Sequence, residues 1–83
     1  MRPWLAGEVR VSVSVFGALR QVAGGAELQL SLAAGARVRD AIAATHLADR
    51  VDLWVLLDGR RVERDAPLSD GARLTFFQPV GGG

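Results

Sequence analysis

The chain has 83 residues, which suits one compact domain with a small core. Hydrophobic residues make up 49% and charged residues 23%, a balance that supports a packed core and excludes an intrinsically disordered chain. Ten Arg stand against nine acidic residues, so the net charge of +1 does not indicate a polyanionic partner such as nucleic acid. Cysteine is absent and there is one histidine, so we expect no disulfide and no metal site within the chain.

No segment has the character of a targeting or membrane sequence. Residues 1–7 lack the apolar centre of a signal peptide. The longest strongly apolar run, Leu53–Leu57, is too short to span a bilayer. We therefore expect a cytoplasmic protein.

Two alternating segments open the chain. Residues 8–16 (EVRVSVSVF) place four valines on one face, and polar residues followed by Phe16 on the other, which is the period of a strand. The next stretch, ALRQVAGG, suits one or two helical turns because Leu19 and Val22 lie three residues apart. Residues 27–32 alternate again, with three leucines on one face, and we expect this strand to pair with the first as a hairpin.

The main amphipathic helix is predicted over Arg37–Leu47. Its apolar face follows the i, i+3, i+4, i+7 spacing and consists of Val38, Ala41, Ile42 and Thr45. Arg37 stands where a short polar residue usually caps a helix, so we expect a weaker cap, at a cost of about 1 kcal/mol.

A second hairpin follows the helix. Leu53–Leu57 and Arg60–Arg64 are typical of two short strands around Asp58-Gly59, because this dipeptide accepts the positive φ values of a type I′ turn. Residues 65–71 form a turn cluster that leads into the last strand.

The last strand, ARLTFFQPV, completes the predicted architecture. Leu74 and Phe76 are predicted to face inward and Phe77 outward, and Pro79 ends the hydrogen bonding of the strand. The order of elements predicts an α+β domain in which one main helix covers one face of a sheet.

The segment Gly81–Gly83 is the feature that carries chemistry. Glycine has no Cβ, so a Gly tail can enter a narrow channel, and a terminal glycyl carboxylate is open to attack. The alternative is a frayed terminus or a remnant of a linker, because chain ends are commonly small and disordered.

Three motifs together resemble the molybdopterin synthase small subunit. They are GALRQVAG after the first strand, LLDGRRV, and DAPLSDGARLTFFQPVGGG, and the similarity covers residues 8–83. The resemblance implies a ubiquitin-like β-grasp fold with about five strands, one main helix and a short helix. It also implies a single domain over residues 1–83, with residues 79–83 as a flexible C-terminal tail.

The resemblance further implies a sulfur carrier. An ATP-dependent activating enzyme would adenylate the carboxylate of Gly83, and sulfur would then replace AMP to give a C-terminal thiocarboxylate. The large synthase subunit, in a heterotetramer with this chain, would receive the tail and use its sulfur on cyclic pyranopterin monophosphate. The tail residues are Pro79, Val80, Gly81 and Gly82. No cofactor would be bound stably.

Phe16 and Phe77 are predicted to bind the partner proteins. Both fall on the outward face of their strands, and family members dock through apolar residues at the matching positions. Arg61 occupies a further interface position of that family, where an apolar residue is common. The alternative is that the two rings pack under the helix or the loops, which one β-bulge would accomplish.

Two other readings stay open at the level of the sequence. Carriers for thiamine thiazole or cysteine synthesis share the fold and the Gly-Gly end, although the thiamine type usually lacks the segment that matches Gly17–Gly24. A ubiquitin-like interaction module with an incidental Gly tail would act by docking alone.

Overall fold

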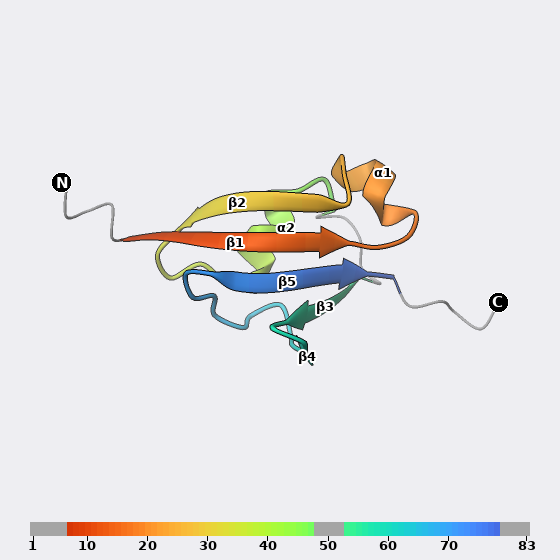
Figure 1. Cartoon of the computed structure of the whole chain (residues 1–83). Coiled ribbons are helices and arrows are strands. Elements are labelled where there is room, and N and C mark those ends of the chain that lie inside the picture. The colour runs from red at the N-terminus through yellow and green to blue at the C-terminus, as the bar shows by residue number, and fades with distance from the viewer. Residues whose placement is uncertain (1–6, 48–52, 79–83) are drawn as a thin grey trace.

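The computed structural model describes residues 7–47 and 53–78, and every structural statement below concerns these residues. Five strands form one sheet: β1 (Glu8–Val15), β2 (Glu27–Ala33), β3 (Trp54–Leu57), β4 (Arg60–Arg61) and β5 (Ala72–Phe77). Two helices accompany them, α1 (Leu19–Ala23) and α2 (Val38–Ala43). Figure 1 shows α2 behind the sheet, so that the opposite, open face looks toward the viewer. The predicted α+β class and the number of strands and helices are confirmed.

The sheet is mixed and has the order β2-β1-β5-β3-β4. β1 pairs with β2 in the antiparallel sense, as predicted for the first hairpin, and pairs with β5 in the parallel sense. β3 pairs with β5 and with β4, both antiparallel. The first and last strands therefore lie at the centre, although about 60 residues separate them in the sequence. This is the β-grasp arrangement that the family resemblance implied.

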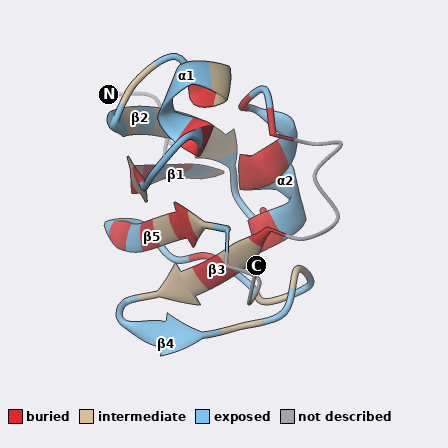
Figure 2. Cartoon of the chain, turned by 90° about the vertical axis from the view of Figure 1, so that its right-hand side faces the viewer, coloured by how far each residue is buried: buried red, intermediate tan, exposed pale blue. Residues whose placement is uncertain are grey.

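Alternating apolar residues place one face of this sheet against α2. The cross-strand partners on that face include Val11 with Leu30, Val13 with Leu74, and Val55 with Phe76. The four valines of β1 are buried, and the leucines of β2 are half-buried because β2 is an edge strand. Figure 2 shows the buried part of α2 turned toward the sheet. The core thus lies between α2 and one face of the sheet, as expected for a domain of two layers.

α2 is shorter than the predicted helix Arg37–Leu47 at its C-terminal end. It ends at Ala43, and the following residues form turns. The Thr45 hydroxyl donates to the Ile42 carbonyl at 2.7 Å and accepts from the Leu47 N–H at 3.2 Å. A threonine hydroxyl competes in this way with the helical hydrogen bonds, which explains why the apolar spacing continues past the end of the helix.

The N-terminal end of α2 is capped by a distant loop. The Val38 N–H donates to the Ala66 carbonyl at 2.9 Å. The Arg39 N–H donates to the Arg64 carbonyl at 2.8 Å. N–H groups in the first turn of a helix have no acceptor within that helix. The loop carbonyls supply the acceptors that the weak cap at Arg37 does not provide. This use of the loop also explains why β4 stops at Arg61 and the predicted strand Arg60–Arg64 is too long.

The tight turn between β3 and β4 agrees with the sequence. Asp58 has φ 49° and Gly59 has φ 87°, both in the left-handed region that a type I′ turn requires. The Asp58 carboxylate accepts a hydrogen bond from the Arg73 N–H at 3.0 Å, and the Asp58 N–H donates to the Arg73 carbonyl at 2.8 Å. The turn is therefore tied to β5 as well as to its own hairpin.

Among the described residues, neither helix is long and apolar enough to cross a membrane. The predicted tail, Pro79–Gly83, lies outside the described residues.

Candidate functional site

Three aromatic side chains form a row across the open face of the sheet. Phe77 at the end of β5 pairs with Trp54 at the start of β3, and their ring centroids are 5.8 Å apart at an interplanar angle of 54°. On the other side of β5, the Phe16 N–H donates to the Phe76 carbonyl at 3.1 Å, so the end of β1 runs beside the end of β5. We call Phe16, Phe77 and Trp54 the aromatic row.

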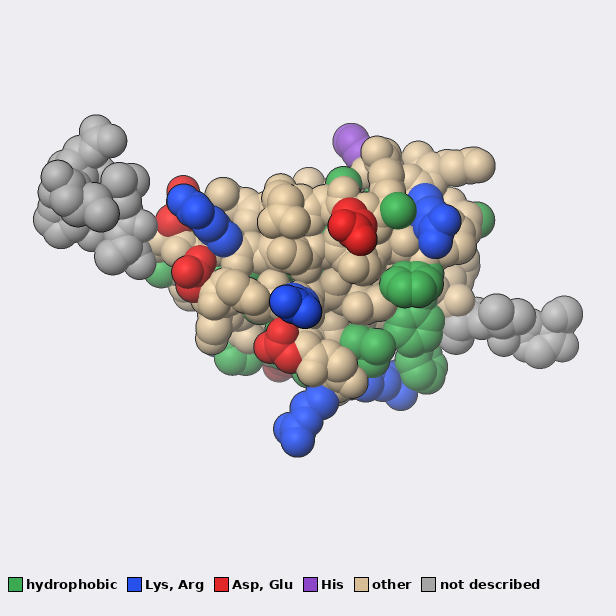
Figure 3. All heavy atoms as spheres, viewed as in Figure 1, with side chains coloured by type: hydrophobic (Ala, Val, Ile, Leu, Met, Phe, Trp, Pro, Cys, Tyr) green, Lys and Arg blue, Asp and Glu red, His purple; other side chains and the backbone are tan. Residues whose placement is uncertain are grey.

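The rings of the row are accessible from the open face. The side chain of Phe16 is 52% exposed and is the one large exposed hydrophobic side chain in the described part of the chain. Phe77 and Trp54 are half-buried, whereas Phe76, one residue before Phe77, is fully buried. The structure confirms that Phe16 and Phe77 face outward and excludes the alternative in which they pack into the core. Figure 3 shows hydrophobic side chains gathered over the ends of β1, β5 and β3.

Arg61 closes the row on the side of β4. Its guanidinium carbon lies 3.6 Å from the centroid of the Trp54 ring, which is a cation–π contact. Arg61 pairs with Leu56 across the hairpin, so it lies on the same face as Leu56 and Trp54. The structure therefore brings together the three body residues predicted to bind partners, Phe16, Phe77 and Arg61, along one line of the sheet.

Trp54 and Leu56 belong to this surface but were not among the predicted site residues. The run Leu53–Leu57 is apolar at every position, so the sequence does not show which residues face outward. The pairing of Trp54 with Phe77 decides this, because directly paired residues lie on the same face of a sheet. The sequence did predict that Phe77 faces outward. If the pairing of Trp54 with Phe77 had been known, the outward face of Trp54 would have followed.

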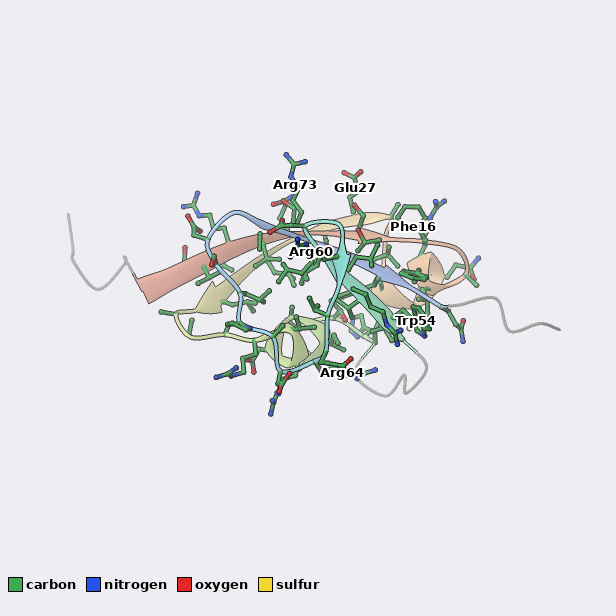
Figure 4. All side chains as sticks on the ribbon, turned by 90° about the horizontal axis from the view of Figure 1, so that it is seen from below. Phe16, Glu27, Trp54, Arg60, Arg64 and Arg73 are labelled. Carbon is green, nitrogen blue, oxygen red and sulfur yellow. The ribbon has the colours of Figure 1, made fainter. Side chains whose placement is uncertain are left out.

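The rest of the open face is polar. Ser12, Ser14, Glu27, Gln29 and Thr75 line a shallow depression beside the β3–β4 turn. The Ser12 hydroxyl donates to the Gln29 side-chain oxygen at 3.3 Å. Figure 4 shows Glu27 and Arg73 projecting from the same side of the sheet as Phe16. The aromatic row is thus a confined apolar surface beside a polar one.

The row has the composition of a docking surface and lacks the groups of an active site. Within residues 7–47 and 53–78, no three His, Cys, Asp or Glu residues gather to hold a metal ion. His46 is exposed and follows α2, which covers the opposite face of the sheet. The described part of the chain therefore presents a confined apolar surface on the open face of the sheet.

The row lies at the root of the predicted tail. β5 ends at Phe77, one described residue follows, and residues 79–83 come next. The six residues from 78 to 83 span at most about 22 Å even when fully extended. A protein that docks on the row and receives Gly83 must therefore have its reacting site within about 22 Å of this end of β5.

Comparisons with known proteins agree with the fold and the motifs. Residues 13–83 match the model of the ThiS family. None of the curated proteins matches the chain by sequence.

Solved structures of similar proteins share this fold over most of the chain. A Pyrococcus furiosus protein assigned as molybdopterin converting factor, subunit 1, is 32% identical, with a TM-score of 0.76 over 87% of this chain and 99% of its own. SAMP1, the small archaeal modifier protein 1 of Haloferax volcanii, is 26% identical, with a TM-score of 0.75 over 89% and 99%.

A third structure shows the fold alone, because its identity is low. It is the complex of subunits 1 and 2 of molybdopterin-converting factor from Helicobacter pylori, which is 21% identical, with a TM-score of 0.59 over 90% of this chain and 100% of that one. The family match covers most of the chain, and the shared architecture is that of ubiquitin-like proteins. The chain belongs to the ThiS family of ubiquitin-like, β-grasp sulfur carriers and modifiers.

Proposed function

We propose that this protein is the small, sulfur-carrying subunit of molybdopterin synthase. The observation that carries the proposal is the aromatic row at the root of the Gly tail, which lets a docked partner receive that tail. The match to a molybdopterin converting factor subunit 1 at 32% identity supports this pathway over the other carriers of the family. The family match also runs through Gly83.

In this proposal the reacting group is the carboxylate of Gly83. A carboxylate resists nucleophiles, so an activating enzyme first transfers AMP to it from ATP and releases pyrophosphate. A persulfide then attacks the acyl carbon and AMP leaves, which gives an acyl disulfide. A second thiol attacks the cysteine sulfur of this acyl disulfide, forms a disulfide with it and releases the thiocarboxylate. The protein itself binds no cofactor stably and contributes the acyl group.

The tail delivers this group without side chains in the way. Gly81, Gly82 and Gly83 have no Cβ, so they fit a narrow channel in extended or left-handed conformations. Pro79 and Val80 connect them to β5, and Pro79 restricts the backbone at the start of the tail. These roles are part of the proposal and concern residues beyond the described part.

The proposed partner is the large synthase subunit, with which this protein would form a heterotetramer in the cytoplasm. The Helicobacter pylori structure supports such a partner, because it contains subunits 1 and 2 of a molybdopterin-converting factor together. The large subunit would supply the acids, bases and pterin contacts that the aromatic row lacks. The adenylating enzyme would be a second, transient partner.

Intact-mass spectrometry of the protein from cells that make molybdenum cofactor tests the chemistry. Replacing one carboxylate oxygen by sulfur adds about 16 Da. We expect this species in the unaltered protein and its loss when Gly83 is deleted, with an unchanged circular dichroism spectrum. Absence of the heavier species while the pathway is active would overturn the proposal.

A second candidate function is protein modification, which the 26% identity with SAMP1 favours. The same acyl adenylate can be captured by a lysine amine of another protein, giving an amide in place of a thiocarboxylate. Conjugates that carry a glycyl remnant of this tail on lysines would support the modifier. A carrier of the thiamine or cysteine pathway would still show the 16 Da increase but would not support the formation of molybdopterin. An interaction module would show neither product.

A further inference from the structure

Arg61 is a charged residue in direct contact with the aromatic row. Its guanidinium is stacked over Trp54, 3.6 Å from the ring centroid, and Trp54 in turn contacts Phe77. Stacking fixes the position of the charge, because a guanidinium held against an indole ring loses much of the freedom of the long Arg side chain. Arg61 therefore presents a positioned cation at the edge of an apolar surface.

This cation has no acidic partner within the described part of the chain. The ion pair found there joins Arg10 and Glu8, at the other end of β1. Arg20, near the Phe16 end of the row, is different, because its Nε donates to the Val15 carbonyl at 3.2 Å. Arg61 is exposed, and within the described residues no carboxylate contacts its guanidinium.

A protein that covers Trp54 and Phe77 must also cover Arg61. Docking then removes water from the guanidinium. A charge that is buried without a counter-charge reduces the magnitude of the binding free energy more than the surrounding apolar contacts increase it. The surface is therefore compatible with a partner that places an acidic group opposite Arg61.

We propose that Arg61 determines partner specificity and that the tail-receiving partner carries a carboxylate that pairs with the guanidinium of Arg61 when its apolar surface covers the aromatic row. This inference rests on the proposed function, because the partner is the large synthase subunit. A carboxylate pairs with the N–H edge of the guanidinium in its own plane and leaves the face free to stack on Trp54, so the cation–π contact is retained in the complex.

The decisive variant is Arg61→Leu, which places an apolar residue at the edge of an apolar row. If the partner surface opposite Arg61 were apolar, leucine would bind as tightly as arginine or more tightly. If that surface carries a carboxylate, leucine leaves it buried and unpaired, and the dissociation constant for the purified large subunit rises about 30-fold or more. Isothermal titration calorimetry measures this change.

Arg60→Leu is the matched control. It makes the same change of charge and size one residue away, but Arg60 pairs with Leu57 and so belongs to the opposite face of the hairpin. Its effect on the dissociation constant should stay within about threefold. Arg61→Gln, which keeps a polar side chain, provides a second variant if the leucine variant does not fold, and it should weaken binding in the same direction.

A charge exchange identifies the partner group. Arg61→Glu should weaken binding further than Arg61→Leu, and changing the correct acidic residue of the large subunit to Arg should restore most of the loss. Failure of every such exchange to restore binding would overturn the assignment of a carboxylate.

The two failures are distinguishable. If the unaltered protein does not bind the large subunit, the proposed function is wrong and the inference falls with it. If the unaltered protein binds and Arg61→Leu binds as tightly or more tightly, the inference is wrong and the proposed function stands.

Discussion

Phe76 and Phe77 show how one step along a strand separates stability from binding. Phe76 is fully buried in the core between β5 and α2, whereas Phe77 is half-buried and contacts Trp54 on the open face. Both are the same amino acid in the same strand. Their difference comes entirely from the alternation of side chains across a sheet.

We predict opposite consequences for their alanine variants. Phe76→Ala should lower the free energy of unfolding by about 3–5 kcal/mol, because it leaves a cavity in the core. Phe77→Ala should lower it by only about 1 kcal/mol, the scale of one aromatic contact, while weakening binding to the large subunit more than tenfold.

Urea unfolding followed by circular dichroism, together with calorimetric titration, measures both effects. Phe16→Ala is a useful companion, since an exposed ring contributes little to the fold. Unchanged affinity of both Phe77→Ala and Phe16→Ala would exclude the aromatic row as the docking surface.

At the scale of elements, the β3–β4 hairpin positions Arg61 over Trp54. The hairpin is short, and its turn depends on two residues with positive φ, Asp58 and Gly59. A Cβ at Gly59 would meet no other atom within 4 Å, so the requirement for glycine there is one of backbone conformation and not of space. The backbone conformation of this turn therefore determines where the Arg61 guanidinium lies.

Gly59→Ala should destabilise the protein by about 1–2 kcal/mol, because an L-residue is strained at this φ value. Gly25→Ala is the control, since Gly25 is not in the left-handed region and an added Cβ would make only ordinary contacts, 3.9 Å and longer. That control should be neutral or slightly stabilising. Equal losses for the two variants in thermal or urea unfolding would contradict the conformational explanation.

The whole molecule depends on the pairing of its first and last strands. β1 and β5 are central and hydrogen-bonded on both sides, whereas β4 is a two-residue edge strand. The core between the sheet and α2 is continuous and includes residues from both helices and from every strand except β4. A single cooperative unit is expected from this architecture.

Native-state hydrogen exchange should show this hierarchy. Amides of β1 and β5 should exchange only through global unfolding, and those of β4 through local opening. Urea unfolding should give one midpoint by tryptophan fluorescence and by circular dichroism. Separate midpoints for β1–β2 and β3–β5 would contradict the prediction of one domain over residues 1–83.

Most of the elements could be predicted from local patterns, because alternation and turn residues act over short distances. The strands at residues 8–16 and 27–32 and the Asp58-Gly59 turn were found with correct partners or geometry. The errors concerned the lengths of α2 and β4, which are shorter than predicted. The Thr45 hydroxyl ends α2 early through a local bond to the Ile42 carbonyl. The helix also uses the loop carbonyls of Arg64 and Ala66, for which there is no local sequence signal.

Some residues of the candidate site could likewise be predicted from the sequence, and others could not. Alternation alone predicted that Phe16 and Phe77 face outward, and the structure confirms this. The faces of Trp54 and Leu56 could not be predicted, because every residue from Leu53 to Leu57 is apolar and only pairing with β5 distinguishes the two sides. The contact of Arg61 with Trp54 likewise requires the hairpin to be folded.

By itself, the sequence determined the α+β class, the inward and outward faces of the long strands, the tight turn, and a Gly tail whose proposed chemistry rests on a family resemblance. These depend on the conformational preferences of neighbouring residues and on the period of side chains along a strand. Only the tertiary structure decided that the ends of β1, β5 and β3 lie side by side and that Arg61 stacks on Trp54. The aromatic row joins residues far apart in the chain and forms only when burial of the common core brings the first and last strands together. Arg61 and Trp54 are closer in the chain, and they meet only when the β3–β4 hairpin is folded.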